Sequence, residues 1–237
     1  MLRIHRRIPA EDLRLLIFDL DGTLIDSRVD LCNSVNAMLR NFRRPELPCE
    51  MIATYIGDGA PMLVRRALGD PDDQEFLNAA LQYFLAWYRE HKLDHTQVYE
   101  GIREILEDIR RARNGQIKMA VLSNKPVNPS RAILEALGLS PFFFQVYGGN
   151  SFPTKKPDPL GAQELLREAG SASRQAAMIG DSANDVLTAR NAGMWSIGLN
   201  WGLSPESLQR VPPDVLIDRP DELGELLLAG PEGPWTE

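Results

Sequence analysis

Short apolar runs separated by helical stretches recur along this chain, and this alternation restricts the folds open to it. The three clearest runs each end in polar residues: LLIFDL (15–20), IKMAVLS (117–123) and AAMIGD (176–181). Weaker apolar runs lie near 144–147, 196–199 and 214–218, with apolar residues at helical spacing between the runs. Uninterrupted apolar strands that alternate with helices form parallel sheets covered on both faces. We therefore predict an α/β fold with a Rossmann-like parallel sheet as its core.

A long helical stretch interrupts this pattern directly after the first predicted strand. From about residue 27 to residue 92, apolar residues recur at the spacing of a helix, and prolines and glycines divide the stretch into about four helices. A chain of 237 residues suits one core with a smaller inserted module. We predict a catalytic α/β core made of residues 1–25 and 95–237, with a small all-helical cap inserted at 26–94.

The composition is that of an ordinary globular protein, with 43% hydrophobic and 25% charged residues. The net charge of −7 argues against nucleic acid or an anionic membrane as the main partner, because phosphate backbones bind to cationic surfaces. No window approaches the roughly 18 uninterrupted apolar residues of a membrane span, and the first residues lack the apolar centre of a signal peptide. A small phosphorylated molecule needs only a few local charges and stays possible. The oligomeric state is left open.

The two cysteines, Cys32 and Cys49, fall within the predicted helical stretch. Two cysteines do not make a disulfide framework, so we expect them to be reduced and the protein to be cytoplasmic. His5 to Arg7 are interpreted as part of a frayed terminus rather than a basic docking arm, and residues 231–237 as a loose tail.

Acidic and other polar residues gather where the predicted strands end. The first strand is followed by Asp19 and Asp21, the second by Ser123, and the third by Asp181, with Asp185 four residues later. Any one of these carboxylates is more often a helix cap or a turn residue. Together they meet at one edge of a parallel sheet, where ligands of such folds bind. Clustered carboxylates repel one another unless a cation joins them, and hard oxygen ligands suit Mg²⁺.

The lysines support a site at this edge. The chain has 21 Arg but only five Lys, and three of these are Lys125, Lys155 and Lys156. Lysines that merely solvate a turn would not be expected to concentrate in these two short segments.

The segments FDLDGTLIDS (18–27), VLSNK, KKPDP and GDSANDV resemble the four ordered motifs of the haloacid dehalogenase superfamily. The resemblance covers about residues 14–228. Within the superfamily the chain is similar to bacterial phosphoglycolate phosphatases, through YIGDGAPMLVRRAL in the predicted cap and GGNSFPTKKPDPL in the core. An acid two residues after the nucleophile, as Asp21 is, distinguishes phosphatases and phosphomutases from haloalkanoate dehalogenases, which have no oxygen leaving group to protonate.

This resemblance implies a role for each motif residue. Asp19 is the nucleophile that takes the phosphoryl group, and Asp21 is the general acid for the leaving alkoxide and then the base for water. Mg²⁺ is held by the Asp19 carboxylate, the Asp21 backbone carbonyl and Asp181. Further roles follow for the phosphoryl-binding and supporting residues: Ser123, Lys156 and the backbone around Asn124 hold the phosphoryl oxygens, and Asp185 orients Lys156 or a metal-bound water.

Three other functions share parts of these motifs. A sugar-phosphate mutase resembling β-phosphoglucomutase carries the same motifs and is the nearest alternative. A phospho-accepting signalling module also uses clustered Asp, a Ser or Thr and a Lys, but such modules are about half this length and have no cap. A catalytically inactive binding protein is the third, although no motif position is lost.

The substrate depends on the predicted cap rather than on the core. Gly57-Asp58-Gly59 separates two predicted helices and can bend close to a ligand, and Arg65 follows within the next helix. We expect Asp58 and Arg65 to help select the substrate, the guanidinium by pairing with a carboxylate on it. A helix-capping Asp58 and a solvated Arg65 are equally compatible with the sequence. The resulting prediction is a Mg²⁺-dependent phosphatase for a small phosphomonoester, with 2-phosphoglycolate as the first candidate.

Overall fold

The computed structural model describes residues 3–228, apart from the side chains of residues 113 and 114. Its centre is a seven-stranded sheet in the order β1-β9-β8-β7-β2-β5-β6. The strands are β1 (Arg3–Ile4), β2 (Leu15–Phe18), β5 (Lys118–Leu122), β6 (Gln145–Tyr147), β7 (Ala176–Gly180), β8 (Trp195–Leu199) and β9 (Val215–Ile217). Every pairing in this sheet is parallel except that of β1 with β9. The α/β prediction is therefore confirmed.

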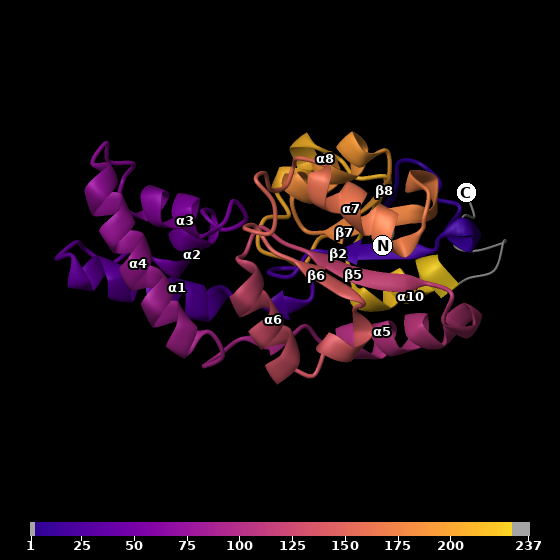
Figure 1. Cartoon of the computed structure of the whole chain (residues 1–237), viewed down its shortest axis with the longest axis horizontal. Helices are drawn as coiled ribbons and strands as arrows, with labels where there is room; N and C mark the ends of the chain where they lie inside the picture. The colour runs from indigo at the N-terminus through magenta and orange to yellow at the C-terminus, as the bar shows by residue number, and fades with distance from the viewer. Residues whose placement is uncertain (1–2, 229–237) are drawn as a thin grey trace.

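Helices cover both faces of the sheet (Figure 1). One face packs against α5 (Ile102–Arg111), α6 (Val127–Ala136) and α10 (Pro220–Leu228), and the other against α7 (Leu160–Ala169) and α8 (Ala183–Ala192). Successive residues of β2 serve opposite faces, since Leu16 and Phe18 belong to the first cluster and Leu15 and Ile17 to the second. Short helices complete the core: η1 (Ala10–Asp12), η2 (Ala112–Gly115), η3 (Ser140–Phe142), η4 (Ser173–Gln175) and α9 (Ser207–Arg210).

Four helices lie at one end of the molecule, away from most of the sheet (Figure 1). They are α1 (Arg28–Asn41), α2 (Cys49–Ala53), α3 (Ala60–Ala67) and α4 (Gln74–His91), and they share a hydrophobic cluster of their own that includes Val35, Met38 and Phe84. We call α1 to α4 the cap, as the domain proposed from the sequence. A two-stranded ribbon, β3 (Ile25–Asp26) with β4 (Gln97–Val98), carries the chain into and out of it.

A buried carboxylate fixes the start of the cap to its exit. Asp30 in α1 is 1% exposed and accepts hydrogen bonds from the backbone N–H groups of His95 and Thr96 and from the Thr96 hydroxyl. The entering and leaving segments are therefore held side by side, and the ribbon and Asp30 together form the connection between cap and core.

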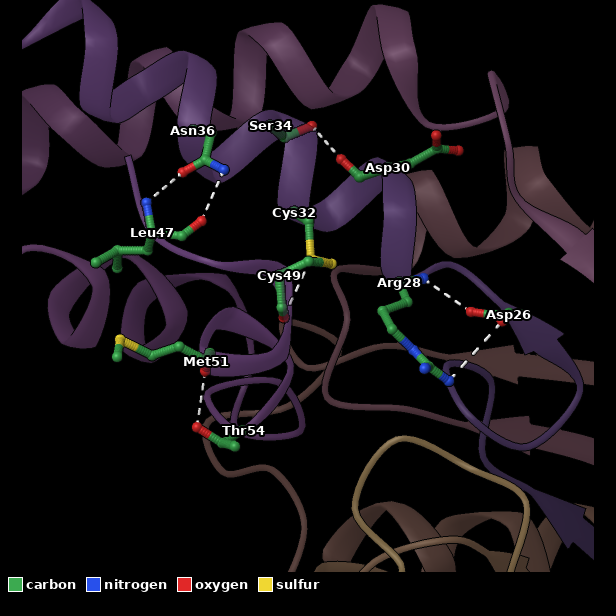
Figure 2. Close-up of a disulfide and its surroundings, with 10 residues drawn as sticks. All are labelled: Asp26, Arg28, Asp30, Cys32, Ser34, Asn36, Leu47, Cys49, Met51 and Thr54. Atoms are coloured by element: carbon green, nitrogen blue, oxygen red, sulfur yellow. Dashed lines mark hydrogen bonds and ion pairs between the residues drawn. A yellow bond between two sulfur atoms is a disulfide. The ribbon is translucent and has the colours of Figure 1, made fainter. Parts of the chain in front are cut away.

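The expectation of two reduced cysteines is wrong for this structure. Cys32 in α1 and Cys49 at the start of α2 form a disulfide, which Figure 2 shows between the two helices. They lie in separate helices, and the turn after α1 brings them together. Asn36 in α1 also holds this turn, because its side-chain amide donates to the Leu47 carbonyl and accepts from the Leu47 N–H. The cytoplasmic location stays a prediction and loses the support that unpaired cysteines gave it.

The expectation of a frayed amino terminus is also wrong, because residues 3–6 are held against the sheet. Arg3 and Ile4 pair with Leu216 and Val215, and the backbone N–H groups of His5 and Arg6 both donate to the Asp214 carbonyl. The Arg6 guanidinium lies 2.7 Å from Asp214 Oδ1. The predicted tail at 231–237 lies outside the described residues.

Within residues 3–228, no helix combines the length and the apolar character needed to cross a membrane.

Candidate active site

The predicted motif residues meet because of the strand order. β2 lies between β5 and β7, with Phe18 in register with Val121 on one side and Ile179 on the other. The segments that follow these three strands therefore leave the sheet next to one another. Asp19 follows the central strand, and Ser123 and Asp181 follow its neighbours, so the three side chains line one cavity.

The Lys156 side chain bridges the carboxylates of Asp19 and Asp185. Its ammonium lies 2.9 Å from Asp19 Oδ1 and 2.6 Å from Asp185 Oδ1, and it is 4% exposed. Burial alone would lower the pKa of Lys156, but Asp185 and Asp19 raise it above its usual value. Burial also raises the pKa of Asp19 to about 6, against the opposing effect of Lys156. This lysine is therefore a fixed positive charge beside Asp19.

Asp185 is fully engaged by its neighbours. Its Oδ1 receives the Lys156 ammonium, and its Oδ2 accepts from the backbone N–H and the hydroxyl of Ser182 at 3.1 and 2.7 Å. The two contacts with Ser182 follow from the place of Asp185 in the first turn of α8, where a carboxylate caps the helix. Asp185 has little capacity left for another ligand, so its geometry suits the orientation of Lys156.

Asp181 is enclosed by backbone. Its Oδ2 accepts from the N–H groups of Leu203 and Ser204 at 2.6 and 3.1 Å. Gly22, at a φ of 84°, passes so close that a Cβ there would lie 2.3 Å from Asp181 Oδ2. Burial, together with the nearby carboxylates of Asp185 and Asp19, raises the pKa of Asp181 to about 8. A buried carboxylate in this position is costly unless a cation offsets its charge.

The carboxylates are arranged as a divalent cation requires. Oxygens of Asp19, Asp181 and Asp185 lie within 4.8 Å of one another, and all three residues are buried. Since Asp185 is already bonded to Lys156 and Ser182, Asp19 and Asp181 are the carboxylates with oxygens left for a metal. Oxygen-only ligands of this charge fit Mg²⁺.

Asp21 lines the same cavity as this cluster and has partners of its own. The Ser27 hydroxyl donates to Asp21 Oδ1 at 2.5 Å, and the Lys125 ammonium lies 3.0 and 3.1 Å from its two carboxylate oxygens. Two of the three acids that line the cavity thus have a buried lysine each, Lys156 for Asp19 and Lys125 for Asp21.

Asn124 links the core to the cap. Its amide nitrogen donates to the Gly57 carbonyl at 2.9 Å and to the Lys156 carbonyl at 3.1 Å. Its amide oxygen is buried without a hydrogen-bond partner among the described residues. Ser123, just before it, is 4% exposed and lines the same cavity as Asp19.

The cavity has about 690 Å³ of empty space, its open mouth included. The core supplies its polar floor, and the cap supplies a mostly apolar wall that includes Leu31, Ile56, Leu63 and Phe84. Tyr88, in α4, has the only side-chain hydroxyl that the described part of the cap adds to the lining. A ligand bound beside Asp19 would be covered by the apolar side chains of the cap. This cover excludes water and strengthens the charge interactions in the cavity.

The two residues expected from the sequence to contact the substrate lie outside the lining. The Arg65 guanidinium is 2.7 Å from Asp70 Oδ1, at the far end of α3. The Asp58 carboxylate receives the Arg66 guanidinium at 2.5 Å and the Asn184 amide at 2.9 Å. Burial alone would raise the pKa of Asp58, but Asn184 and Arg66 lower it below its usual value. A substrate-selecting role for either residue stays a prediction.

Sequence reasoning missed three residues that the structure brings to the site. Lys125 stood out in the lysine census but received no role, and its pairing with Asp21 depends on a turn geometry that no spacing rule gives. Tyr88 was hidden among the apolar residues of a helix. Asn184 lies inside the GDSANDV motif, yet its contact with Asp58 crosses 126 residues of sequence.

Several known proteins are similar to this chain in sequence, and solved structures are similar to it in fold. Residues 16–199 match the model of the haloacid dehalogenase-like hydrolase family. A phosphoglycolate phosphatase of Chromobacterium violaceum is 36% identical over 222 residues, covering 92% of this chain and 98% of that protein. Phosphoglycolate phosphatase 1 of Pseudomonas aeruginosa is 38% identical over 212 residues, covering 86% of this chain and 76% of that protein.

A solved structure is similar over nearly the whole chain as well. The crystal structure of a predicted phosphoglycolate phosphatase from Haemophilus somnus superposes with a TM-score of 0.83 at 30% sequence identity. The match covers 90% of this chain and 96% of that one, so it includes the cap as well as the sheet.

Proposed function

Because the chain belongs to the family of haloacid dehalogenase-like hydrolases, we propose that it hydrolyses a small phosphomonoester through a phospho-aspartate at Asp19. The substrate we propose first is 2-phosphoglycolate, because the similar proteins from Chromobacterium violaceum and Pseudomonas aeruginosa are phosphoglycolate phosphatases by name. The observation that carries the proposal is the pair Asp19 and Asp21, which line one cavity and each contact a separate buried lysine.

The geometry suits a two-step reaction. In the first step an Asp19 carboxylate oxygen attacks phosphorus, the ester P–O bond breaks, and Asp21 gives its proton to the departing alkoxide. In the second step Asp21 takes a proton from water, the water oxygen attacks phosphorus, and the acyl-phosphate P–O bond breaks. Inorganic phosphate leaves and the Asp19 carboxylate is restored.

Two groups of residues support these steps. Lys156 brings a fixed positive charge against Asp19, which helps a carboxylate to approach an anionic phosphoryl group. Ser123 and the backbone around Asn124 lie where they can donate to the phosphoryl oxygens, since both residues line the cavity beside Asp19.

A Mg²⁺ ion completes the proposal. The Asp19 carboxylate, the Asp21 backbone carbonyl and the Asp181 carboxylate would hold it, while Asp185 keeps Lys156 in place. When bound, the ion neutralises charge between the carboxylates and the phosphoryl group. The buried, mutually repelling carboxylates of Asp19 and Asp181 support this assignment.

The first experiment is phosphate release from p-nitrophenyl phosphate with Mg²⁺, then with EDTA, then with Mg²⁺ restored. A hydrolase of this kind loses activity with EDTA and regains it with Mg²⁺, whereas a binding module releases no phosphate at any stage. A panel of small phosphate esters, compared by kcat/KM, then tests 2-phosphoglycolate. Conversion of a hexose phosphate into its isomer without net phosphate release would instead identify a mutase.

Two variants separate the metal site from the lysine. Asp181→Asn should raise the Mg²⁺ concentration needed for half-maximal activity, because it removes one of the few anionic ligands of the ion. Lys156→Ala should lower the rate even at saturating Mg²⁺, because it removes a charge that the ion does not replace. An identical Mg²⁺ dependence in the two variants would contradict this division of roles.

A further inference from the structure

The cavity lining contains one lysine and one tyrosine, close to Asp21, and neither has a role so far. Lys125 is 7% exposed and Tyr88 is 4% exposed, and both line the cavity. They come from different parts of the chain, Lys125 from the loop after β5 and Tyr88 from α4 of the cap. The Lys125 ammonium lies over the Tyr88 ring, 4.6 Å from its centroid.

The Tyr88 hydroxyl is a buried donor without a partner. The neighbouring Lys125 ammonium can only donate to this hydroxyl, and no group among the described residues accepts its proton, although it is enclosed by protein. Burial raises the pKa of Tyr88 to about 12, so the hydroxyl keeps its proton at neutral pH and can donate. An unsatisfied buried polar group costs roughly 1–3 kcal/mol. A ligand group that accepts from this hydroxyl would remove that cost.

Lys125 has capacity for a ligand as well. An ammonium carries three N–H donors, and Lys125 directs at most two of them at the oxygens of Asp21. The ammonium lies 3.0 and 3.1 Å from the two Asp21 carboxylate oxygens and is the only Lys or Arg side chain in the described lining of the cavity.

The position of Asp21 shows which part of a substrate these groups would meet. In the proposed reaction Asp21 protonates the ester oxygen, so this oxygen must come within hydrogen-bond distance of its carboxylate. Lys125 is itself at hydrogen-bond distance from the same carboxylate, at 3.0 Å. The ammonium is thus within two hydrogen-bond lengths of the ester oxygen, where the first atoms of the leaving group lie.

We propose that Lys125 and Tyr88 bind a carboxylate on the leaving group and so select phosphate esters of short hydroxy acids. The ammonium and the tyrosine hydroxyl each donate to one carboxylate oxygen, in the role that Arg65 was expected to have from the sequence. This inference rests on the proposed phosphatase function. It accounts for the apolar remainder of the cap wall, whose described residues offer no side-chain partner for the several hydroxyls of a sugar.

The test compares 2-phosphoglycolate with ethyl phosphate, which has a methyl group in place of the carboxylate. The measured quantity is the ratio of kcat/KM for the two esters, because any general effect on Asp21 cancels in it. Lys125→Met should lower the ratio about 10- to 100-fold, and Tyr88→Phe about 3- to 10-fold, the usual range for charged and neutral hydrogen bonds. For Tyr88→Phe the loss should appear mainly as a higher KM for 2-phosphoglycolate.

Matched controls exist on the same elements. Tyr83→Phe changes a tyrosine of α4 outside the lining, and Lys118→Met changes a lysine at the opposite end of β5. Neither should alter the ratio. Lys125→Arg keeps the positive charge and should therefore lower the kcat/KM ratio less than Lys125→Met does. Should Lys125→Met fail to fold, Tyr88→Phe still decides, because it removes only a hydroxyl whose proton no described residue accepts.

The possible failures are distinct. Equal losses for both esters in Lys125→Met, with an unchanged ratio in Tyr88→Phe, would overturn the inference. A wild-type protein without preference for 2-phosphoglycolate over ethyl phosphate would also overturn it, yet leave the phosphatase proposal standing. Absence of phosphate release from every ester would contradict the proposed function itself.

Discussion

Asp19 and Asp21 are separated by one residue but lie in different electrostatic surroundings. Asp19 is next to Lys156 and near two further carboxylates, whereas Asp21 contacts Lys125 and the Ser27 hydroxyl. The first environment suits a carboxylate that stays ionised and joins a cation. The second holds a carboxylate in the cavity lining between a lysine and a hydroxyl, which suits proton transfer. Asp19 and Asp21 have the same side chain, so their different proposed roles follow from the groups around them.

Asp21→Asn should lower the rate roughly 10²–10⁴-fold for alkyl phosphates, the usual contribution of a general acid–base group. The loss should be smaller for p-nitrophenyl phosphate in the first step, because nitrophenolate leaves without a proton. Single-turnover kinetics with both esters measure this difference. An equal loss in the first step for the two esters would mean that Asp21 does not protonate the leaving group.

The roles at this scale were only partly predictable. The spacing of Asp19 and Asp21 and the alternation of strands and helices identify the sheet edge, since parallel strands must bring their carboxyl ends together. The partners of Asp21 could not be found in this way. Lys125 contacts it across 104 residues, and such pairing depends on the turn after β5 rather than on any local period.

At the scale of elements, residues 42–48 connect α1 to α2 without helix or strand. The segment between them is crossed by the Cys32–Cys49 disulfide and by the Asn36–Leu47 hydrogen bonds. Leu31 next to the first cysteine lines the cavity, and α2 leads into the loop that reaches the core. The bridge thus restrains a segment that connects two parts of the cavity wall.

Replacing both cysteines by serine should destabilise the cap. The bridge spans a sequence separation of 17 residues, and a cross-link over a loop of about this length is worth about 3 kcal/mol by restricting the unfolded chain. Urea unfolding of Cys32→Ser/Cys49→Ser against the oxidised wild type measures the difference. A reductant should lower wild-type stability towards that of the variant and leave the variant unchanged. Identical unfolding of all samples would show that the bridge contributes nothing.

The secondary structure of the core was easier to predict than that of its edges. Continuous apolar runs predicted β2, β5 and β7 within one or two residues, because strands buried on both faces need no alternation. The two-residue strands β1, β3 and β4 carry no such pattern. They exist through pairing with residues distant in sequence, as Arg3 pairs with Leu216, and so escape any local reading.

At the scale of the whole molecule, the cap is docked on the core by a short loop. The Gly57 carbonyl accepts from Asn124, the Asp58 carbonyl accepts from Lys155, and the Asp58 carboxylate accepts from Asn184. Gly59, at a φ of 82°, comes so close that a Cβ there would lie 2.9 Å from the Asn124 carbonyl oxygen. These contacts hold Gly57 and Gly59 of the cap in the lining of the cavity that contains Asp19.

Asn184→Ala should weaken this docking without changing the substrate preference. We expect kcat/KM to fall about 3- to 10-fold for 2-phosphoglycolate and ethyl phosphate alike, less than for the full loss of a hydrogen bond to a charged group, because Arg66 still pairs with Asp58. Small-angle scattering should show a larger mean radius of gyration if the cap opens more often. Asn191→Ala is the matched control, since that amide in the same helix bonds only the Pro157 carbonyl. A change in the ratio between the two esters would place Asn184 in substrate selection instead.

The central claim is that the phosphoryl group passes through Asp19. Mixing the protein with an ester that carries a radiolabelled phosphoryl group, followed by an acid quench, should leave label on the chain. Asp21→Asn should retain more of it, since the second step lacks its base. Proteolysis should place the label on the peptide containing Asp19, and Asp19→Asn, which is nearly isosteric, should carry none and release no phosphate. Label on another residue, or continued turnover by a folded Asp19→Asn protein, would contradict the account.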